Sequence, residues 1–267
     1  MFLNPDWEYR LWTDDDLSKL VADHYPDLEG LFHSYPNPVQ RADLGRYLIL
    51  HHCGGIYADL DIECVAPLAA IQNETRIVFA EEPAEHHIPA QSLGLPVFLF
   101  NGVIASPKAH RFWPHLINVL KKCAHAKNYV LESTGPLALT GAYLSFDAPE
   151  TISVNSCHLF NPITDKGHFS QSRPHGDFAD HHLRNHYWRG SWYRCRTTSR
   201  LQRLKTSCRR LKYRLGRGPY LDKEKLRAQI DTATLYRPIS PTDENVCILI
   251  PVRDAAPFLD RCFAVGN

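Results

Sequence analysis

A helix, a glycine pair and a short apolar strand follow one another in the first quarter of the chain, and this unit constrains the fold most. Apolar side chains recur at helical spacing between Gln40 and His52. Gly54-Gly55 ends the helix, because glycine readily adopts the backbone conformation found after helix C-termini. The strand 56–58 comes next and leads directly into Asp59-Leu60-Asp61. This order is typical of an α/β domain.

Strand-like and helix-like segments alternate over the rest of the first 193 residues. Their periodicities predict strands over 7–12, 76–80, 97–106, 152–154 and 182–188, and helices from 14, over 110–124 and over 137–146. A hydrophobic fraction of 44% is enough for a real core. No run of about 18 apolar residues suits a membrane-spanning helix. Residues 1–193 are therefore predicted to form one α/β domain.

The chain changes character after residue 193. Ten basic residues and no acidic ones fall between 194 and 218, where leucines line one helical face, so residues 194–245 are predicted to be a basic amphipathic helix and linker. The helix could bind anionic lipid, or it could be a solvated linker packed on the domain. Nucleic acid is not expected as a partner, because aromatic residues are nearly absent from it. Residues 246–267 begin with an apolar run that predicts a buried parallel strand.

Two Asp-x-Asp triplets occur, in different settings. The triplet 14–16 begins a predicted helix, where acidic side chains favour the N-terminus. Asp59 and Asp61 instead follow a strand, and side chains at i and i+2 of an extended segment point to the same side. Such oxygen ligands suit Mg²⁺ or Mn²⁺, which bind together with substrate phosphates. The alternative is a solvated acidic strand end.

The helix before this strand carries charges of both signs. Asp43 could bind ribose hydroxyls, while Arg46 could pair with a phosphate or orient that carboxylate. The alternative is a surface ion pair between residues three apart on a helix.

These residues resemble the core of a known family. Arg41-x-Asp43-x-x-Arg46-Tyr47 followed by Gly54-Gly55-x-Tyr57-x-Asp59-x-Asp61 is similar to glycosyltransferase family 32, which includes yeast-type α-mannosyltransferases and bacterial capsule or lipopolysaccharide sugar transferases. The family is distantly related to the clostridial glucosylating toxins. Segments 4–14, 101–107, 134–136 and 186–192 resemble further motifs in the family's order.

The resemblance implies a GT-A fold, a Rossmann-like mixed sheet with flanking helices, here with a C-terminal helical extension. It also implies a nucleotide-sugar donor (a UDP- or GDP-hexose), Mn²⁺ or Mg²⁺, and retention of the anomeric configuration. By position, Asp43 and Arg46 are expected to contact the ribose, and Tyr57 to join this donor-binding set. Asp59 is expected to serve the ribose and the metal-bound water, and Asp61 to ligate the metal directly.

The later motifs supply further candidates. His186 is a third candidate metal ligand, and Ser191 and Trp192 are expected to close over the diphosphate; the alternative for this segment is an aromatic strand end in the core. Asn101 is a candidate catalytic residue that contacts the donor sugar or its oxocarbenium form, unless it only shapes a turn. The histidine pair 181–182 with His186 suggests zinc only weakly, since no fourth ligand is evident.

Two departures from the family accompany the resemblance. The family's usual first strand precedes the segment matched here by residues 4–14, so the chain is expected to lack it. Residues 246–262 resemble the first strand and helix of an inverting family 2 glycosyltransferase, so 246–267 is expected to be the stub of a second transferase domain. The alternative is a peripheral terminal strand.

The sequence thus predicts a metal-dependent retaining glycosyltransferase that moves a hexose to a glycan or lipid-linked acceptor, in surface polysaccharide or glycolipid synthesis. The first residues lack the basic region of a signal peptide, so a cytoplasmic location is expected, with residues 194–218 as a candidate peripheral membrane contact. One alternative is a non-catalytic module that binds nucleotide sugars or glycans. Another is a metal-dependent phosphotransferase.

Overall fold

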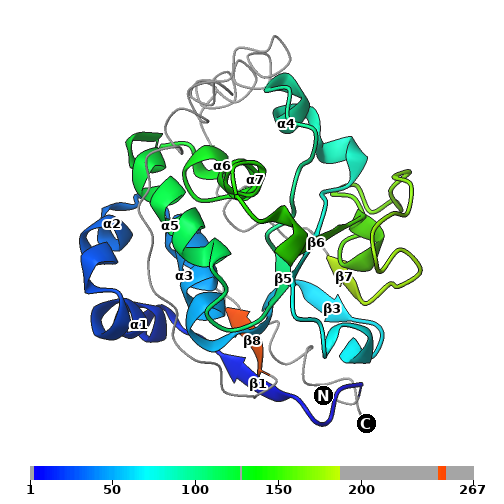
Figure 1. The fold of residues 1–267 in the computed structure, drawn as a ribbon, viewed down its shortest axis with the longest axis horizontal. Coiled ribbons are helices and arrows are strands. Elements are labelled where there is room, and N and C mark those ends of the chain that lie inside the picture. The colour runs from blue at the N-terminus through cyan, green and yellow to red at the C-terminus, as the bar shows by residue number, and fades with distance from the viewer. Residues whose placement is uncertain (1–2, 127, 187–245, 251–267) are drawn as a thin grey trace.

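A mixed β-sheet forms the centre of the computed structural model, which describes residues 3–126, 128–186 and 246–250 (Figure 1). Its order is β1-β8-β2-β5-β4-β6; β5 is antiparallel to both neighbours and the other pairs are parallel. A smaller sheet pairs β3 with β7. The strands are β1 (Glu8–Leu11), β2 (Gly55–Asp59), β3 (Ile62–Cys64), β4 (Ile77–Ala80), β5 (Val103–Ser106), β6 (Ile152–Asn155), β7 (Arg184–His186) and β8 (Val246–Ile250).

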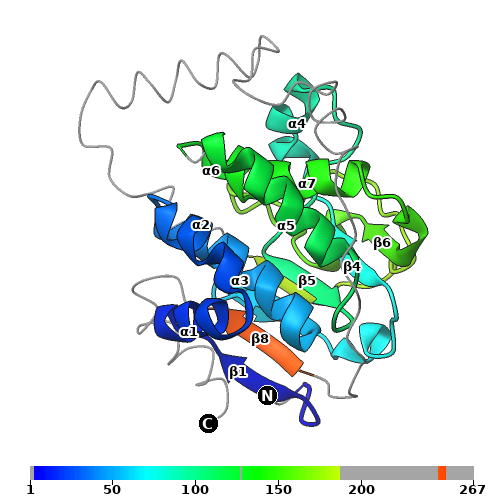
Figure 2. The same ribbon diagram turned by 60° about the vertical axis from the view of Figure 1, so that its left-hand side comes forward.

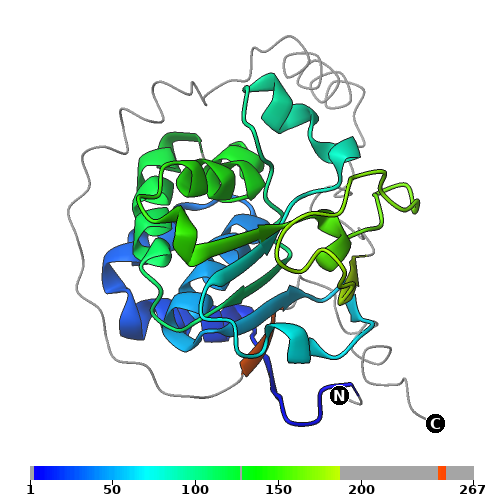
Figure 3. The ribbon, with the colours of Figure 1, turned by 45° about the vertical axis from the view of Figure 1, so that its right-hand side comes forward.

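Helices cover one face of the central sheet, and the β3–β7 sheet and its loops lie on the other (Figures 2 and 3). The mixed sheet with flanking helices confirms the predicted fold class, an α/β domain of the GT-A type. The predicted C-terminal helical extension lies outside the described residues. None of the described helices is long and apolar enough to cross a membrane. They are α1 (Asp14–His24), α2 (Glu29–Ser34), α3 (Pro38–Cys53), α4 (Ile88–Ser92), α5 (Phe112–Cys123), α6 (Val130–Ser133) and α7 (Pro136–Leu144).

The helix α3 begins and ends at strong local signals. Asn37 and Gln40 form a capping box at its start, and Pro38 occupies the first helical position, where a missing N–H costs nothing. Gly54 follows its last turn with φ of +73°, a conformation that a β-carbon would oppose. Its positive φ turns the chain from α3 into β2, which is why the predicted helix–glycine–strand unit forms as expected.

The strand β8 lies inside the sheet, between β1 and β2 (Figure 2). Val246 pairs with Glu8 of β1, and Ile250 pairs with Asp59 at the end of β2. The backbone of 246–250 is thus the parallel strand that the sequence predicts. The assignment of residues 246–267 to a second domain stays a prediction.

The strand predicted over 97–106 is shorter in the structure, where only Val103–Ser106 forms β5. The Gly102 carbonyl still accepts from the Asp59 N–H at 2.8 Å, in register with β2. The Asn101 carbonyl instead accepts from Arg46 Nη1 at 2.7 Å, and Leu99 forms only an isolated bridge with Glu81. The strand is interrupted here because the Asn101 carbonyl binds a side chain of α3 rather than a neighbouring strand.

Candidate metal and nucleotide-sugar site

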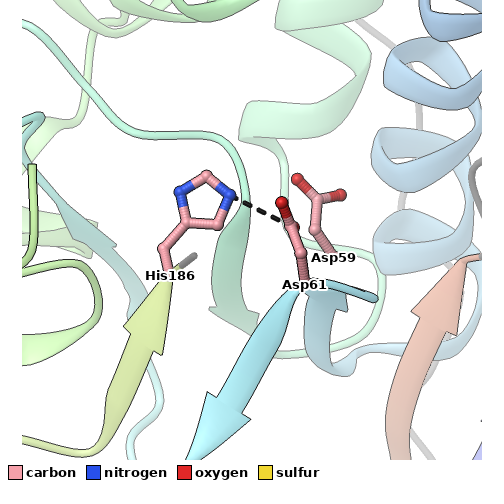
Figure 4. Close-up of side chains that lie close together, drawn as sticks. All are labelled: Asp59, Asp61 and His186. Atoms are coloured by element: carbon pink, nitrogen blue, oxygen red, sulfur yellow. Dashed lines mark hydrogen bonds and ion pairs between the residues drawn. The ribbon is translucent and has the colours of Figure 1, made fainter. Parts of the chain in front are cut away.

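Three predicted metal ligands meet at the end of β2. Asp59 is the last residue of that strand, and Asp61 follows it immediately before β3. The antiparallel pairing of β3 with β7 places His186 opposite Ile62. One ligand atom from each of the three side chains lies within 4.8 Å of the others (Figure 4). In the part of the chain that the structure describes, no other group of histidine, cysteine and acidic side chains converges in this way.

The donor set fits a divalent cation that prefers oxygen. His186 Nε2 and Asp61 Oδ1 are 3.1 Å apart, which is within hydrogen-bond distance (Figure 4). Two carboxylates with one imidazole suit Mn²⁺ well, and Mg²⁺ accepts the carboxylates but favours nitrogen less. The side chains of Asp59 and Asp61 are 18% and 19% exposed, which leaves them accessible to a ligand.

Neighbouring donors fix the orientation of Asp59. Arg46 Nη1 lies 3.2 Å from Asp59 Oδ1, and the hydroxyl of Tyr57 donates to the same oxygen. The guanidinium also lies over the Tyr57 ring, 4.7 Å from its centroid. Burial raises the pKa of Asp59, and the positive charge of Arg46 opposes this rise. The carboxylate is therefore held in one position, as a metal-binding group requires.

A buried polar network supports Arg46 from the other side. Its Nη2 lies 3.0 Å from Asp43 Oδ1, and the same oxygen accepts from Asn101 Nδ2 at 3.1 Å. The other oxygen, Oδ2, accepts from Thr134 Oγ1 at 2.9 Å. Asp43 and Arg46 are each only 3% exposed. The ion pair between Asp43 and Arg46, for which a surface position was the alternative, therefore lies in the interior.

The contacts of Asp43 in this network show what the residue does in the structure. Both carboxylate oxygens of Asp43 are bound by protein groups, so in the structure this residue orders Arg46 and Asn101. Burial raises the pKa of Asp43 to about 6, while Arg46 and the hydrogen bond from Thr134 oppose that rise. Contacts of Asp43, Arg46, Tyr57 and Asn101 with a donor stay predictions.

The structure does not describe every predicted candidate. Ser191 and Trp192 lie outside the described residues. The histidine pair 181–182 does not join His186 in a ligand cluster, and His182 instead contacts Asn185 Oδ1 at 2.8 Å. The structure adds Thr134 to the network, a role that the sequence analysis did not predict. Its position in the Thr-Gly-Pro segment, which resembles a family motif, could have pointed to it.

Comparison with known proteins agrees with this geometry. Residues 1–78 match the family model described as "Glycosyltransferase sugar-binding region containing DXD motif". The chain is 34% identical over 142 residues to inositol phosphoceramide mannosyltransferase 3 of Schizosaccharomyces pombe, covering 52% of this chain and 36% of that protein. It is 32% identical over 148 residues to mannosyl phosphorylinositol ceramide synthase SUR1 of Saccharomyces cerevisiae, covering 52% of this chain and 34% of that protein.

A third relative is the initiation-specific alpha-1,6-mannosyltransferase of Saccharomyces cerevisiae, 34% identical over 68 residues, which are 24% of this chain and 14% of that protein. The chain thus spans about a third of the length of the first two relatives. These matches confirm the predicted resemblance to the family 32 type of glycosyltransferase with a DXD motif. The resemblance of the C-terminal segment to family 2 stays a prediction.

Proposed function

We propose that this chain is a metal-dependent, retaining glycosyltransferase that moves a hexose from a UDP- or GDP-hexose to a glycan or lipid-linked acceptor. The observation that carries the proposal is the convergence of Asp59, Asp61 and His186 at the end of β2. In open α/β sheets, ligands bind beyond the carboxyl ends of parallel strands, and this cluster lies there. The match of residues 1–78 to a DXD sugar-binding region supports the same conclusion.

Asp59, Asp61 and His186 are the residues that would hold Mn²⁺ or Mg²⁺. The bound cation would neutralise the diphosphate as the bond between sugar and phosphate oxygen breaks. Arg46 and Tyr57 keep the Asp59 carboxylate oriented through their contacts with Oδ1. The acceptor hydroxyl attacks the anomeric carbon on the face that the diphosphate leaves, and the departing phosphate oxygen takes the hydroxyl proton. No protein nucleophile is required.

The names of the relatives favour a particular donor and acceptor. All three are mannosyltransferases or mannosyl-transferring synthases by name, and two are named for inositol phosphoceramide or mannosyl phosphorylinositol ceramide. Mannose is accordingly the first hexose to test, and a phosphorylated lipid headgroup is the first acceptor class. Such an acceptor suits surface glycolipid synthesis at the cytoplasmic face of a membrane. Capsule and lipopolysaccharide synthesis are the corresponding roles for a polysaccharide acceptor.

The test is hydrolysis and transfer across a panel of UDP- and GDP-hexoses, with Mn²⁺ and with a chelator. Removal of a direct metal ligand in Asp61→Ala should lower the Mn²⁺-dependent release of nucleotide by at least about 100-fold, the upper range seen when supporting residues of metal sites are changed. The matched control is Asp180→Ala, which removes an exposed carboxylate. Binding of a nucleotide sugar without turnover would instead support the non-catalytic module.

A further inference from the structure

A second carboxylate, that of Glu81, lies at the same edge of the sheet as Asp59. Ile56 of β2 and Val78 of β4 both pair with Ala105 of the intervening β5. Three residues further along each strand come Asp59 and Glu81. The Glu81 N–H donates to the Asn155 carbonyl at 2.8 Å, so the β4–β6 ladder continues to this residue. Glu81 forms an isolated antiparallel bridge with Leu99, while the Asp59 N–H donates to the Gly102 carbonyl, so both acidic residues lie at this edge of the sheet with residues 99–102 between them.

Both side chains belong to the face of the sheet that the helices cover. Tyr57 and Phe79, which precede Asp59 and Glu81 by two residues, pack in the core cluster on that face. Because side chains two apart on a strand share a face, Asp59 and Glu81 share this one. Burial, together with the nearby charge of Glu81, raises the pKa of the Tyr143 hydroxyl on α7. Glu81 therefore points to the helix side, as Asp59 does.

The Glu81 carboxylate is largely buried but accepts no hydrogen bond among the described residues. Its side chain is 21% exposed, and the nearest cation-forming group is His175 Nε2 at 3.7 Å, beyond hydrogen-bond distance. The adjacent Glu82, by contrast, contacts His86 Nδ1 at 3.2 Å. Burial raises the pKa of Glu81, and the positive charges of His175 and His87 oppose this rise. Apart from the contact with His175, the acceptor positions of the Glu81 carboxylate are not used by the described residues and are open to a ligand.

We propose that Glu81 binds the acceptor, its carboxylate accepting hydrogen bonds from hydroxyl groups of a sugar or cyclic polyol. The inference rests on the proposed function, because it places the acceptor beside a donor held at Asp59 and Asp61. Glu81 thereby selects acceptors that present hydroxyl donors.

The direct test is saturation-transfer NMR on the full chain with two probes, myo-inositol and methyl α-D-mannopyranoside. At least one probe should bind the wild type, and Glu81→Gln should weaken that binding by about tenfold or more, the size of one hydrogen bond to a charged group. His175→Asn is the matched control for a purely structural ion pair, and Asp180→Asn controls for loss of one negative charge. Both should bind the probe as the wild type does.

Three results would overturn the inference: neither probe binds the wild type, Glu81→Gln binds as well as the wild type, or His175→Asn loses as much binding as Glu81→Gln. In transfer assays, Glu81→Gln should raise the KM for the acceptor more than it lowers kcat. The proposed function has its own readout, Mn²⁺-dependent release of nucleotide from the donor. Its failure in the wild type would reject the transferase, while the NMR result still decides the role of Glu81.

Discussion

Replacing Arg46 with methionine tests whether the buried network is held together by this guanidinium. Arg46 is 3% exposed and lies 3.0 Å from Asp43 Oδ1 and 3.2 Å from Asp59 Oδ1. It also donates to the Asn101 carbonyl at 2.7 Å. Arg46→Met keeps much of the side-chain volume but leaves two carboxylates without their shared counter-charge.

The expected loss of folding stability in Arg46→Met is large for a single substitution. Breaking a buried ion pair by removing one partner costs about 3–5 kcal/mol, because the other charge stays buried and uncompensated. Arg76 provides the matched control, because it is 35% exposed and pairs with Glu74 and Asp177 at the surface. Exposed ion pairs contribute about 0–1 kcal/mol, so Arg76→Met should change stability by no more than that.

The penalty should also depend on pH, through Asp43. Its pKa is already raised to about 6 by burial, and Arg46 opposes the rise, so Arg46→Met moves the pKa higher. A carboxyl group with a raised pKa binds its proton more tightly in the folded state. Its contribution to stability therefore falls as the pH rises from the pKa of the group in the unfolded state through its pKa in the folded state. The penalty of Arg46→Met should be smaller at pH 5.5 than at pH 7.5, by about 1 kcal/mol or more.

Urea unfolding at both pH values, followed by tryptophan fluorescence and circular dichroism, measures these free energies. A loss below about 1 kcal/mol for Arg46→Met at pH 7.5, equal to that of Arg76→Met, would refute the argument that Arg46 compensates the charges of Asp43 and Asp59. A penalty that does not change between pH 5.5 and pH 7.5 would refute the assignment of the pH dependence to Asp43.

Two further substitutions test how the site is built. In Gly102→Ala, the added β-carbon would collide with the Phe100 ring and lie 3.0 Å from Asp59 Oδ2. The Asp59 carboxylate would be displaced, so Mn²⁺-dependent nucleotide release should fall by about tenfold or more. Normal activity of this variant would contradict the packing. Ile248→Pro would interrupt β8, so hydrogen exchange of the backbone amides of residues 8–11 in β1 should accelerate. The control is Asp14→Pro, at the first position of α1, where proline is tolerated and these amides should stay protected. Unchanged exchange in Ile248→Pro would exclude the pairing of β8 with β1.

Local chemistry made much of the fold predictable from the sequence. The helix over 40–52 was predicted within two residues at its start and one at its end, because apolar periodicity and Gly54 mark its limits; the structure has Pro38–Cys53. The proximity of Asp59 to Asp61 also followed from the sequence, since two residues of spacing put both carboxylates on one side of an extended chain. The strand over 97–106 was predicted too long, because its apolar pattern does not reveal that the Asn101 carbonyl bonds to the side chain of Arg46.

The sequence by itself determined the helix–glycine–strand unit, the α/β class and the position of the Asp-x-Asp motif, because these depend on neighbours along the chain. Only the tertiary structure decided that Asp43 and Arg46 pair in the interior and that His186, 125 residues from Asp61, reaches it. It also set Glu81 at the same sheet edge as Asp59 and placed β8 between β1 and β2. These features depend on strand register and burial, which arise between segments distant in sequence and leave no local periodicity to read.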